Sequence, residues 1–289
     1  MTSKIEKLQE IFTSKEFGVL PGNLAFSFFL SVIPILTLIF YVLTSFNLPL
    51  DMINDFLTEI FPQGVVDLLQ PVFTSELTAD SLIPIILGIT VAANGCNAII
   101  LTSNTIYNFK NASFLRRMIK SLLLTMCIIL LIAFVVIVPL LGKSILNIVS
   151  GVLNFGVKHE MIINIIYYII QVPVSLLVMF FFIKIVYTFA PDQRIPSKYV
   201  TKGAIFTTIS WLLITTLFSF YINNMARYDL VYGNLANIVI LLLWFYVLAY
   251  VFVIGLYMNK TNTEVGIEKT NTIKLEEIRK KIKDEKKKK

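Results

Sequence analysis

Six long apolar runs decide what this chain can fold into. Each has close to the roughly 20 apolar residues that a helix needs to cross the hydrocarbon core of a bilayer. An open sheet edge in lipid would leave backbone groups without hydrogen bonds, so the runs predict helices and not strands. We therefore predict an all-α, polytopic membrane protein with six transmembrane helices. The predicted spans are residues 24–46, 82–103, 119–141, 162–190, 204–221 and 235–258.

The composition supports this class. The chain is 56% hydrophobic and 15% charged, whereas soluble domains have about 45–50% apolar and about 25% charged residues. Such an excess of apolar side chains needs a second apolar solvent, which is lipid. The main competing count is five spans, because Asn94, Gly95 and Asn97 interrupt the second run.

The cationic residues predict the orientation of the chain. Lys and Arg are concentrated in one set of loops and in the tail, whereas residues 47–81 contain none and carry six acidic residues. Positively charged loops stay in the cytoplasm, so both termini are expected inside a bacterial cytoplasmic (inner) membrane. The predicted domains are a cytoplasmic amphipathic segment (1–23), a six-helix transmembrane domain (24–258) and a basic cytoplasmic tail (259–289).

Amphipathic segments flank the spans. In the external loop 47–81, apolar residues recur at helical spacing opposite Asp51, Asp55 and Glu59, which predicts a helix at the outer membrane surface. The stretch around residues 145–153 shows a similar pattern. The tail places Leu275 and two isoleucines on one face among Lys and Arg residues, so it is expected either to attract anionic lipid or to remain solvated and partly disordered.

Polar residues inside the runs are the candidate substrate path. Burying a polar group in hydrocarbon is costly, so such residues either serve a site or pair helices. Asn94, Asn97 and Asn104 form a polar stripe along the second span, and Ser27 and Ser31 share a face of the first span. Interhelical hydrogen bonding explains the asparagine stripe about equally well.

Polar and charged residues near the span ends are candidates for binding an anionic group. Lys184 and Arg194 lie near the predicted inner face, and Asn223 and Arg227 near the outer face. Snorkelling of Lys184 to the interface is the simpler interpretation of that residue. An ordinary polar loop accounts for Asn223 and Arg227 nearly as well.

The candidates for hinges or for helix packing are Pro34, Pro173, Gly233, Trp244 and Gly255. Pro34 and Pro173 interrupt the hydrogen-bond ladder of the first and fourth spans and predict local kinks. Most transmembrane prolines only shape the bundle, and hinge function is the sharper alternative.

Several function classes lack the residues they need. The six predicted spans contain no Asp or Glu, which disfavours carriers coupled through a membrane-embedded carboxylate. The one histidine, His159, lies in a predicted external loop with no nucleophile nearby in sequence. No metal-ligand spacing, phosphate-binding loop or cofactor motif is present, so we predict no catalytic residues, no metal, no cofactor and no nucleic-acid partner.

The last span carries a recognisable pattern, supported by matches elsewhere. Its residues are Tyr232, Gly233, Asn234, Leu235, Leu241, Leu242, Leu243, Trp244, Phe245, Tyr246, Gly255 and Asn259, and the matches before it are Ala25, Ser27, Ser31, Pro34, Asn104, Tyr107, Tyr187, Pro191, Gly203, Ala204 and Trp211. This pattern resembles the YihY/BrkB family of bacterial inner-membrane proteins, over roughly residues 20–260. The resemblance implies a six-span protein with a role in the cell envelope, transport of lipid or another amphiphile being the leading suggestion.

One position departs from the family pattern. Between the glycine and the asparagine of the last span the family usually has an acidic residue, and Tyr257 stands there in this chain. A mechanism that requires this charge is therefore in doubt. Some members of the family were once labelled ribonucleases, and the residue inventory given above argues against that activity here.

Two functions from different classes remain. The leading hypothesis is a transporter or flippase-like protein that moves an amphiphilic, anionic envelope substrate such as a lipid. The alternative is a non-catalytic membrane scaffold whose basic tail and amphipathic loops organise envelope partners or anionic lipid. Removal of residues 261–289 discriminates between them, because a scaffold loses its phenotype and a transporter keeps its flux.

Overall fold

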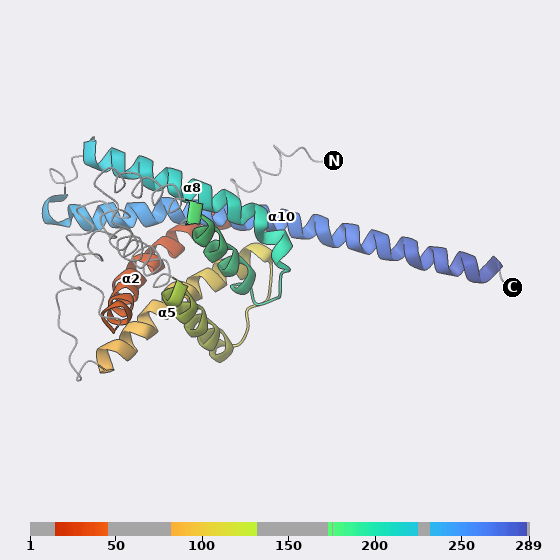
Figure 1. Cartoon of the computed structure of the whole chain (residues 1–289), viewed down its shortest axis with the longest axis horizontal. Coiled ribbons are helices and arrows are strands. Elements are labelled where there is room, and N and C mark those ends of the chain that lie inside the picture. Colours follow the sequence, from red (N-terminus) through yellow and green to blue (C-terminus); the bar gives the residue numbers. More distant parts are fainter. Residues whose placement is uncertain (1–14, 46–81, 132–172, 175, 225–231, 288–289) are drawn as a thin grey trace, which may run out of the picture.

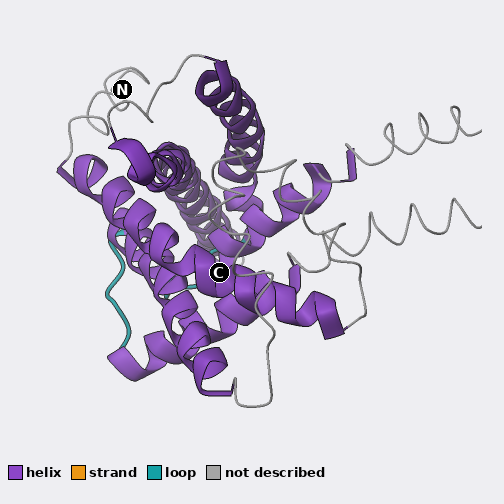
Figure 2. Ribbon diagram, turned by 90° about the vertical axis from the view of Figure 1, so that its left-hand side faces the viewer, coloured by secondary structure: helices purple, strands orange, loops and turns teal. Residues whose placement is uncertain are grey.

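The computed structural model describes residues 15–45, 82–131, 173–174, 176–224 and 232–287, and these residues contain helices and no β-strand (Figures 1 and 2). This confirms the predicted all-α class. Two further helical stretches cover residues 114–131 and 176–189. The named elements are α2 (Lys15–Ser45), α5 (Leu82–Tyr107), α8 (Ser197–Asn224), the short 3₁₀ helix η2 (Gly233–Leu235) and α10 (Ala236–Lys287).

Within the described residues, three helices are long and apolar enough to cross a membrane: Glu16–Ile39, Ser197–Ile222 and Ala236–Thr261. They correspond to the predicted first, fifth and sixth spans. The described parts of the other three predicted spans are helical too, but the third and fourth fall partly outside the described residues. The count of six spans therefore stays a prediction, as do the amphipathic helices expected in residues 47–81 and 145–153, which lie outside the described residues.

The helices extend beyond the apolar runs that predicted them. α2 begins at Lys15 rather than at residue 24, α8 begins at Ser197 rather than at residue 204, and α10 continues from the last span through the basic tail to Lys287. Hydropathy marks the part of a helix that lipid solvates, whereas the backbone ladder continues until a turn stops it. The boundary predicted at residue 259 is thus not a break in secondary structure.

α10 is the central helix of the described bundle. It packs against α8, α2 and α5, while α2 also packs along α5 (Figure 1). In the most apolar stretch of α10, 56% of the residues are buried, against 11% in α8. α8 therefore lies at the periphery, with Leu213, Leu217 and Ile209 exposed in the way that lipid-facing side chains are.

Two helix pairs approach closely at glycines. A Cβ added to Gly95 of α5 would lie 2.7 Å from the Ser31 Oγ of α2, and this hydroxyl donates to the Val91 carbonyl at 3.2 Å. In the second pair, a Cβ at Gly203 of α8 would overlap the Gly255 carbonyl of α10. Small residues of this kind let helix backbones meet in a membrane, where packing replaces the hydrophobic effect.

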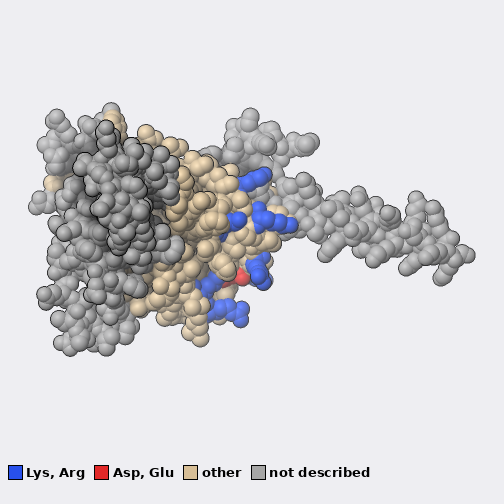
Figure 3. All heavy atoms as spheres, viewed as in Figure 1, with Lys and Arg blue, Asp and Glu red and all other residues tan. Residues whose placement is uncertain are grey.

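Charge is distributed unevenly over the bundle. In Figure 3 the described Lys and Arg side chains gather at the end from which the C-terminal part of α10 extends. The described cations at this end come from three segments, residues 110–120, 194–202 and 260. We refer to it below as the basic end of the bundle.

Candidate functional site

A polar cluster lies at the basic end, where two loops meet the end of α5. Helix α5 stops at Tyr107, and Asn108 adopts a left-handed backbone conformation with φ of 56°, which asparagine tolerates better than most residues. The chain then turns through residues 109–113 into the helix 114–131. The second loop, residues 190–196, joins the helix 176–189 to α8.

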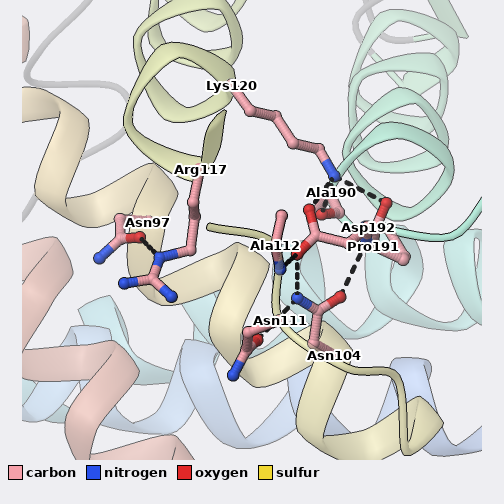
Figure 4. Close-up of polar contacts among 9 residues, drawn as sticks. All are labelled: Asn97, Asn104, Asn111, Ala112, Arg117, Lys120, Ala190, Pro191 and Asp192. Atoms are coloured by element: carbon pink, nitrogen blue, oxygen red, sulfur yellow. Dashed lines mark hydrogen bonds and ion pairs between the residues drawn. The ribbon is translucent and has the colours of Figure 1, made fainter. Parts of the chain in front are cut away.

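Asp192 is the centre of this cluster (Figure 4). One carboxylate oxygen accepts from Asn104 Nδ2 at 2.7 Å and from the Ala112 backbone N–H at 2.9 Å. The other carboxylate oxygen accepts from Lys120 Nζ at 3.0 Å. The backbone N–H of Asp192 donates to Asn104 Oδ1 at 2.8 Å, so the Asn104 side chain bridges to this loop twice.

Lys120, on the helix 114–131, is the cation of the cluster. Besides the ion pair with Asp192, its Nζ donates to the carbonyls of Ala190 at 2.8 Å and Pro191 at 2.7 Å. The side chain of Lys120 is 26% exposed and that of Asp192 is 9% exposed. A cation so tightly coordinated holds the 190–196 loop against the helix far more firmly than an exposed surface pair would.

The environment keeps Asp192 ionised. Burial by itself raises the pKa of the carboxyl, but the hydrogen bonds from the Ala112 N–H, Lys120 and Asn104, with the charge of Lys120, outweigh burial and lower the pKa below its ordinary value. At neutral pH the cluster therefore contains a carboxylate anion with donors from three segments.

The three asparagines of the predicted stripe have different surroundings. Asn104 is fully buried in the Asp192 cluster, and its Nδ2 also donates to Asn111 at 2.9 Å. Asn97 is half-buried and accepts a hydrogen bond from Arg117 Nε at 2.8 Å. Asn94 is exposed and lies ten residues before Asn104 on α5.

The other predicted path residues lie apart from this cluster or outside the described part. Ser27 is half-buried and Ser31 is buried between α2 and α5. Lys184 is half-buried with its Nζ 5.5 Å from the centre of the Phe180 ring, while Arg194 is exposed on the same loop as Asp192. The Asn223 side chain and all of Arg227 lie outside the described residues.

The predicted hinge and packing residues have varied surroundings. Pro34 is half-buried within the continuous helix α2, and Pro173 is exposed. Gly233 opens η2 with a positive φ of 53°, which favours glycine. Trp244 is buried in α10 and stacks obliquely on Phe245. These placements test neither hinge motion nor a substrate path.

Several of the residues that carry the family resemblance make hydrogen bonds to α8 or α10. Tyr187 Oη donates to the Phe252 carbonyl at 2.8 Å and lies 2.7 Å from Thr207 Oγ1. Asn259 Oδ1 accepts from the Gly203 N–H at 2.9 Å, and Trp211 Nε1 donates to the Leu248 carbonyl at 3.0 Å. Tyr257, at the position where the family usually has an acid, is half-buried with its ring centre 6.2 Å from that of Phe17.

Three hydroxyl groups near the end of α5 are buried without a hydrogen bond. Thr102 Oγ1, Ser103 Oγ and Tyr107 Oη have no partner among the described residues, and their residues are 1%, 0% and 7% exposed. Buried hydroxyls in helices commonly bond the carbonyl four residues back, as Thr125 does to Ser121 at 2.8 Å. Orphaned buried groups are rare and point to an absent polar partner.

Sequence reasoning missed Asp192, Lys120 and Arg117 as members of this site. A signal was present, because Asp192 is the one acid in the two predicted inner loops and lies among cations, which favours an ion pair. In the described part of the chain, no three His, Cys, Asp or Glu residues come together as a metal site would need. Cys96 and Cys127 are free thiols.

Comparison with known proteins places the chain among membrane proteins. The family profile described as "Virulence factor BrkB" matches residues 9–277. A putative ribonuclease-like protein, YfkH, of Bacillus subtilis is 27% identical over 258 residues, covering 88% of this chain and 92% of the relative. The UPF0761 membrane protein NTHI0384 of Haemophilus influenzae is 24% identical over 264 residues, covering 88% and 93%. No solved structure matches the chain significantly.

Proposed function

Because this chain belongs to the BrkB family of integral membrane proteins along nearly its whole length, we propose that it moves an anionic amphiphile, such as a lipid, within the bacterial cytoplasmic membrane. The observation that carries this proposal is the set of buried hydroxyls without hydrogen bonds on Thr102, Ser103 and Tyr107. Each such group costs about 1–3 kcal/mol when it is left unsatisfied. A helix that served only for packing would gain stability from apolar residues at these positions.

A passing headgroup would satisfy these hydroxyls. Hydroxyl and amide groups can donate to phosphate or carboxylate oxygens without holding a fixed charge in the hydrocarbon, while the acyl chain of the substrate stays in lipid. Arg117 and Lys120 at the basic end would attract the anionic group at its point of entry or exit. In this proposal both termini and the basic end face the cytoplasm, as the distribution of Lys and Arg favours.

The test is lipid movement by the purified protein in vesicles. The protein is reconstituted into phosphatidylglycerol and phosphatidylcholine vesicles that carry a trace of fluorescent phosphatidylglycerol, and the transbilayer movement of the label is followed by chemical quenching. We expect movement well above that in protein-free vesicles, and slower movement of fluorescent phosphatidylcholine, whose headgroup has no net charge. Equal rates with and without protein would refute the proposal for phosphatidylglycerol.

One observation favours the scaffold alternative. α10 continues beyond Thr261 as one helix to Lys287, about 40 Å at 1.5 Å per residue. In Figure 1 this part extends away from the bundle. Such an arm, or its attraction to anionic lipid, would serve to collect partners. Deletion of residues 261–289 separates the two functions, because a transporter keeps its flux without the arm and a scaffold loses its cellular phenotype.

The printed name of the Bacillus relative concerns that protein alone. Metal-dependent cleavage of RNA needs clustered carboxylates to hold the ions. In the described cluster, Asp192 is a single carboxylate and is already held by Lys120. We therefore propose that the protein is not an enzyme. If the pure protein cleaved RNA and the Asp192→Asn variant did not, this proposal would be overturned.

A further inference from the structure

The groups around Asp192 have the arrangement of an anion-binding site. An amide N–H from Asn104, a backbone N–H from Ala112 and the ammonium of Lys120 converge on one carboxylate from three segments of the chain (Figure 4). Charged and neutral donors of this kind bind phosphate and carboxylate alike, because both present several acceptor oxygens. The ligand in the structure is a side chain of the same protein.

The charge at this point is unbalanced. The helix 114–131 begins next to Ala112, and a helix N-terminus carries a partial positive charge that favours anions. Cations are disfavoured there, yet Arg116, Arg117 and Lys120 all lie within its first two turns. Asp192 supplies one negative charge against these three, and Lys120–Asp192 is the salt bridge found among the described residues.

We propose that this cluster is a binding site for a phosphate-type anionic group, and that Asp192 occupies it as an internal ligand until such a group displaces it. The inference deepens the proposed function, on which it rests, by naming the residues that receive the headgroup. Asp192 then acts as an autoinhibitory contact. Lys120, Asn104 and the Ala112 N–H bind either the carboxylate or the incoming anion.

Displacement of Asp192 has a structural consequence. The same loop is held by its backbone, since the Asp192 N–H donates to Asn104 and the carbonyls of Ala190 and Pro191 accept from Lys120. When Asn104 and Lys120 turn to another anion, these bonds are lost together. Helix α8 begins at Ser197, five residues after Asp192, so occupation of the site by an anion releases the start of α8 from α5.

The test compares anion binding by the full-length protein in a nonionic detergent. Calorimetric titration with inorganic phosphate, and separately with short-chain phosphatidylglycerol, is done at constant ionic strength on the wild type and on Asp192→Asn. The variant keeps the size of the side chain and removes its charge. We expect at least tenfold tighter binding to Asp192→Asn. If only phosphate binds more tightly to the variant, the ligand is a free anion. If the short-chain lipid binds more tightly, the ligand is a lipid headgroup.

Two double variants locate the effect. Adding Lys120→Gln to Asp192→Asn should abolish the tighter anion binding. Adding Lys198→Gln instead should preserve it, because Lys198 is an exposed cation at the same end that lies over the Tyr199 ring and outside the cluster. A folded Asp192→Asn protein that binds no more tightly than the wild type overturns the proposal, as does a gain that survives Lys120→Gln.

If the Asp192→Asn variant does not fold, a second measurement still tests the proposal. Phosphate should raise the melting temperature of the wild type more than chloride does at equal ionic strength, and this difference should vanish in Lys120→Gln. Equal effects in both proteins would contradict the proposal. Tighter anion binding without lipid movement in vesicles would refute the transport function and leave the anion site standing.

Discussion

The contact between α8 and α10 and the polar cluster at the basic end are built in opposite ways. At the first, Gly203 and Gly255 bring two backbones together, and the hydroxyl of Tyr187 is satisfied by Thr207 and the Phe252 carbonyl. At the second, an ion pair joins the helix 114–131 to the loop 190–196, and three hydroxyls of α5 within one turn of Asn104 have no partner among the described residues.

We interpret the α8–α10 contact as a packing region and the basic end as the region of the proposed function. At the α8–α10 contact, a Cβ added to Gly203 or to Gly255 would overlap neighbouring atoms, and such close approach commonly stabilises helix pairs in membranes. Buried polar atoms without a described partner occur in both regions, Asn259 Nδ2 at the first and three α5 hydroxyls at the second, but the ion pair lies at the second. Such groups cost stability, and proteins commonly retain them where they bind or move something. The comparison therefore predicts large stability effects at the first region and functional effects at the second.

The largest expected effect is at Gly255. Any Cβ there would overlap the Tyr187 hydroxyl and Thr207 Oγ1, so Gly255→Leu separates the two helices. Overpacking commonly costs up to about 3 kcal/mol, and the lost Tyr187 hydrogen bonds add to this. We expect little folded protein in the membrane fraction. Gly18→Leu is the matched control, because nothing lies within 4 Å of a Cβ at Gly18.

The next effect is at Asp192. Asp192→Ala leaves Lys120, Asn104 and the Ala112 N–H without their shared acceptor, and hydrogen bonds to charged groups contribute about 1.5–3 kcal/mol. We expect a loss of about 2 kcal/mol, read from thermal unfolding in detergent. A loss as large as that of Gly255→Leu would break the comparison, since the basic end would then be a packing centre.

The pH dependence of stability sharpens the same point. The pKa of Asp192 is lowered in the folded state, so the stability it contributes is fully present above the unfolded pKa of about 3.9 and is lost as the pH falls through the folded pKa. The melting temperature of the wild type should therefore fall more steeply than that of Asp192→Asn between about pH 4 and the folded pKa below it. Parallel curves would show that the carboxylate contributes nothing.

A smaller stability effect is expected at Tyr187 than at Gly255 or Asp192. Tyr187→Phe removes two hydrogen bonds and keeps the ring that packs on Phe252 at 4.7 Å between centres. A loss of about 1 kcal/mol is expected, with lipid movement unchanged per folded molecule. Loss of movement without loss of stability would place function at the α8–α10 contact and reverse the comparison.

The sequence predicted the helices better than the site. The apolar runs at 24–46, 204–221 and 235–258 correspond to α2, α8 and α10, because hydrophobic burial in lipid is a local property of composition. The helix ends were missed, since residues 15–23 mix charged, glycine and proline residues with apolar ones and so do not form an uninterrupted apolar run. The partners of Asn104 were also missed, because Asp192 lies 88 residues away and no periodicity connects them.

The most direct measurement tests the buried hydroxyls of α5 against an exposed one. Thr102→Val with Ser103→Ala removes hydroxyls that have no partner among the described residues, while Thr105→Val removes an exposed hydroxyl that bonds the Leu101 carbonyl at 2.9 Å. By the cost of an unsatisfied buried hydroxyl, the double variant should be at least about 1 kcal/mol more stable than the wild type, while Thr105→Val should stay within about 0.5 kcal/mol of it. Movement of fluorescent phosphatidylglycerol should fall at least tenfold in the double variant and stay at the wild-type rate in Thr105→Val. Equal movement in all three would contradict the assignment of α5 as the substrate path.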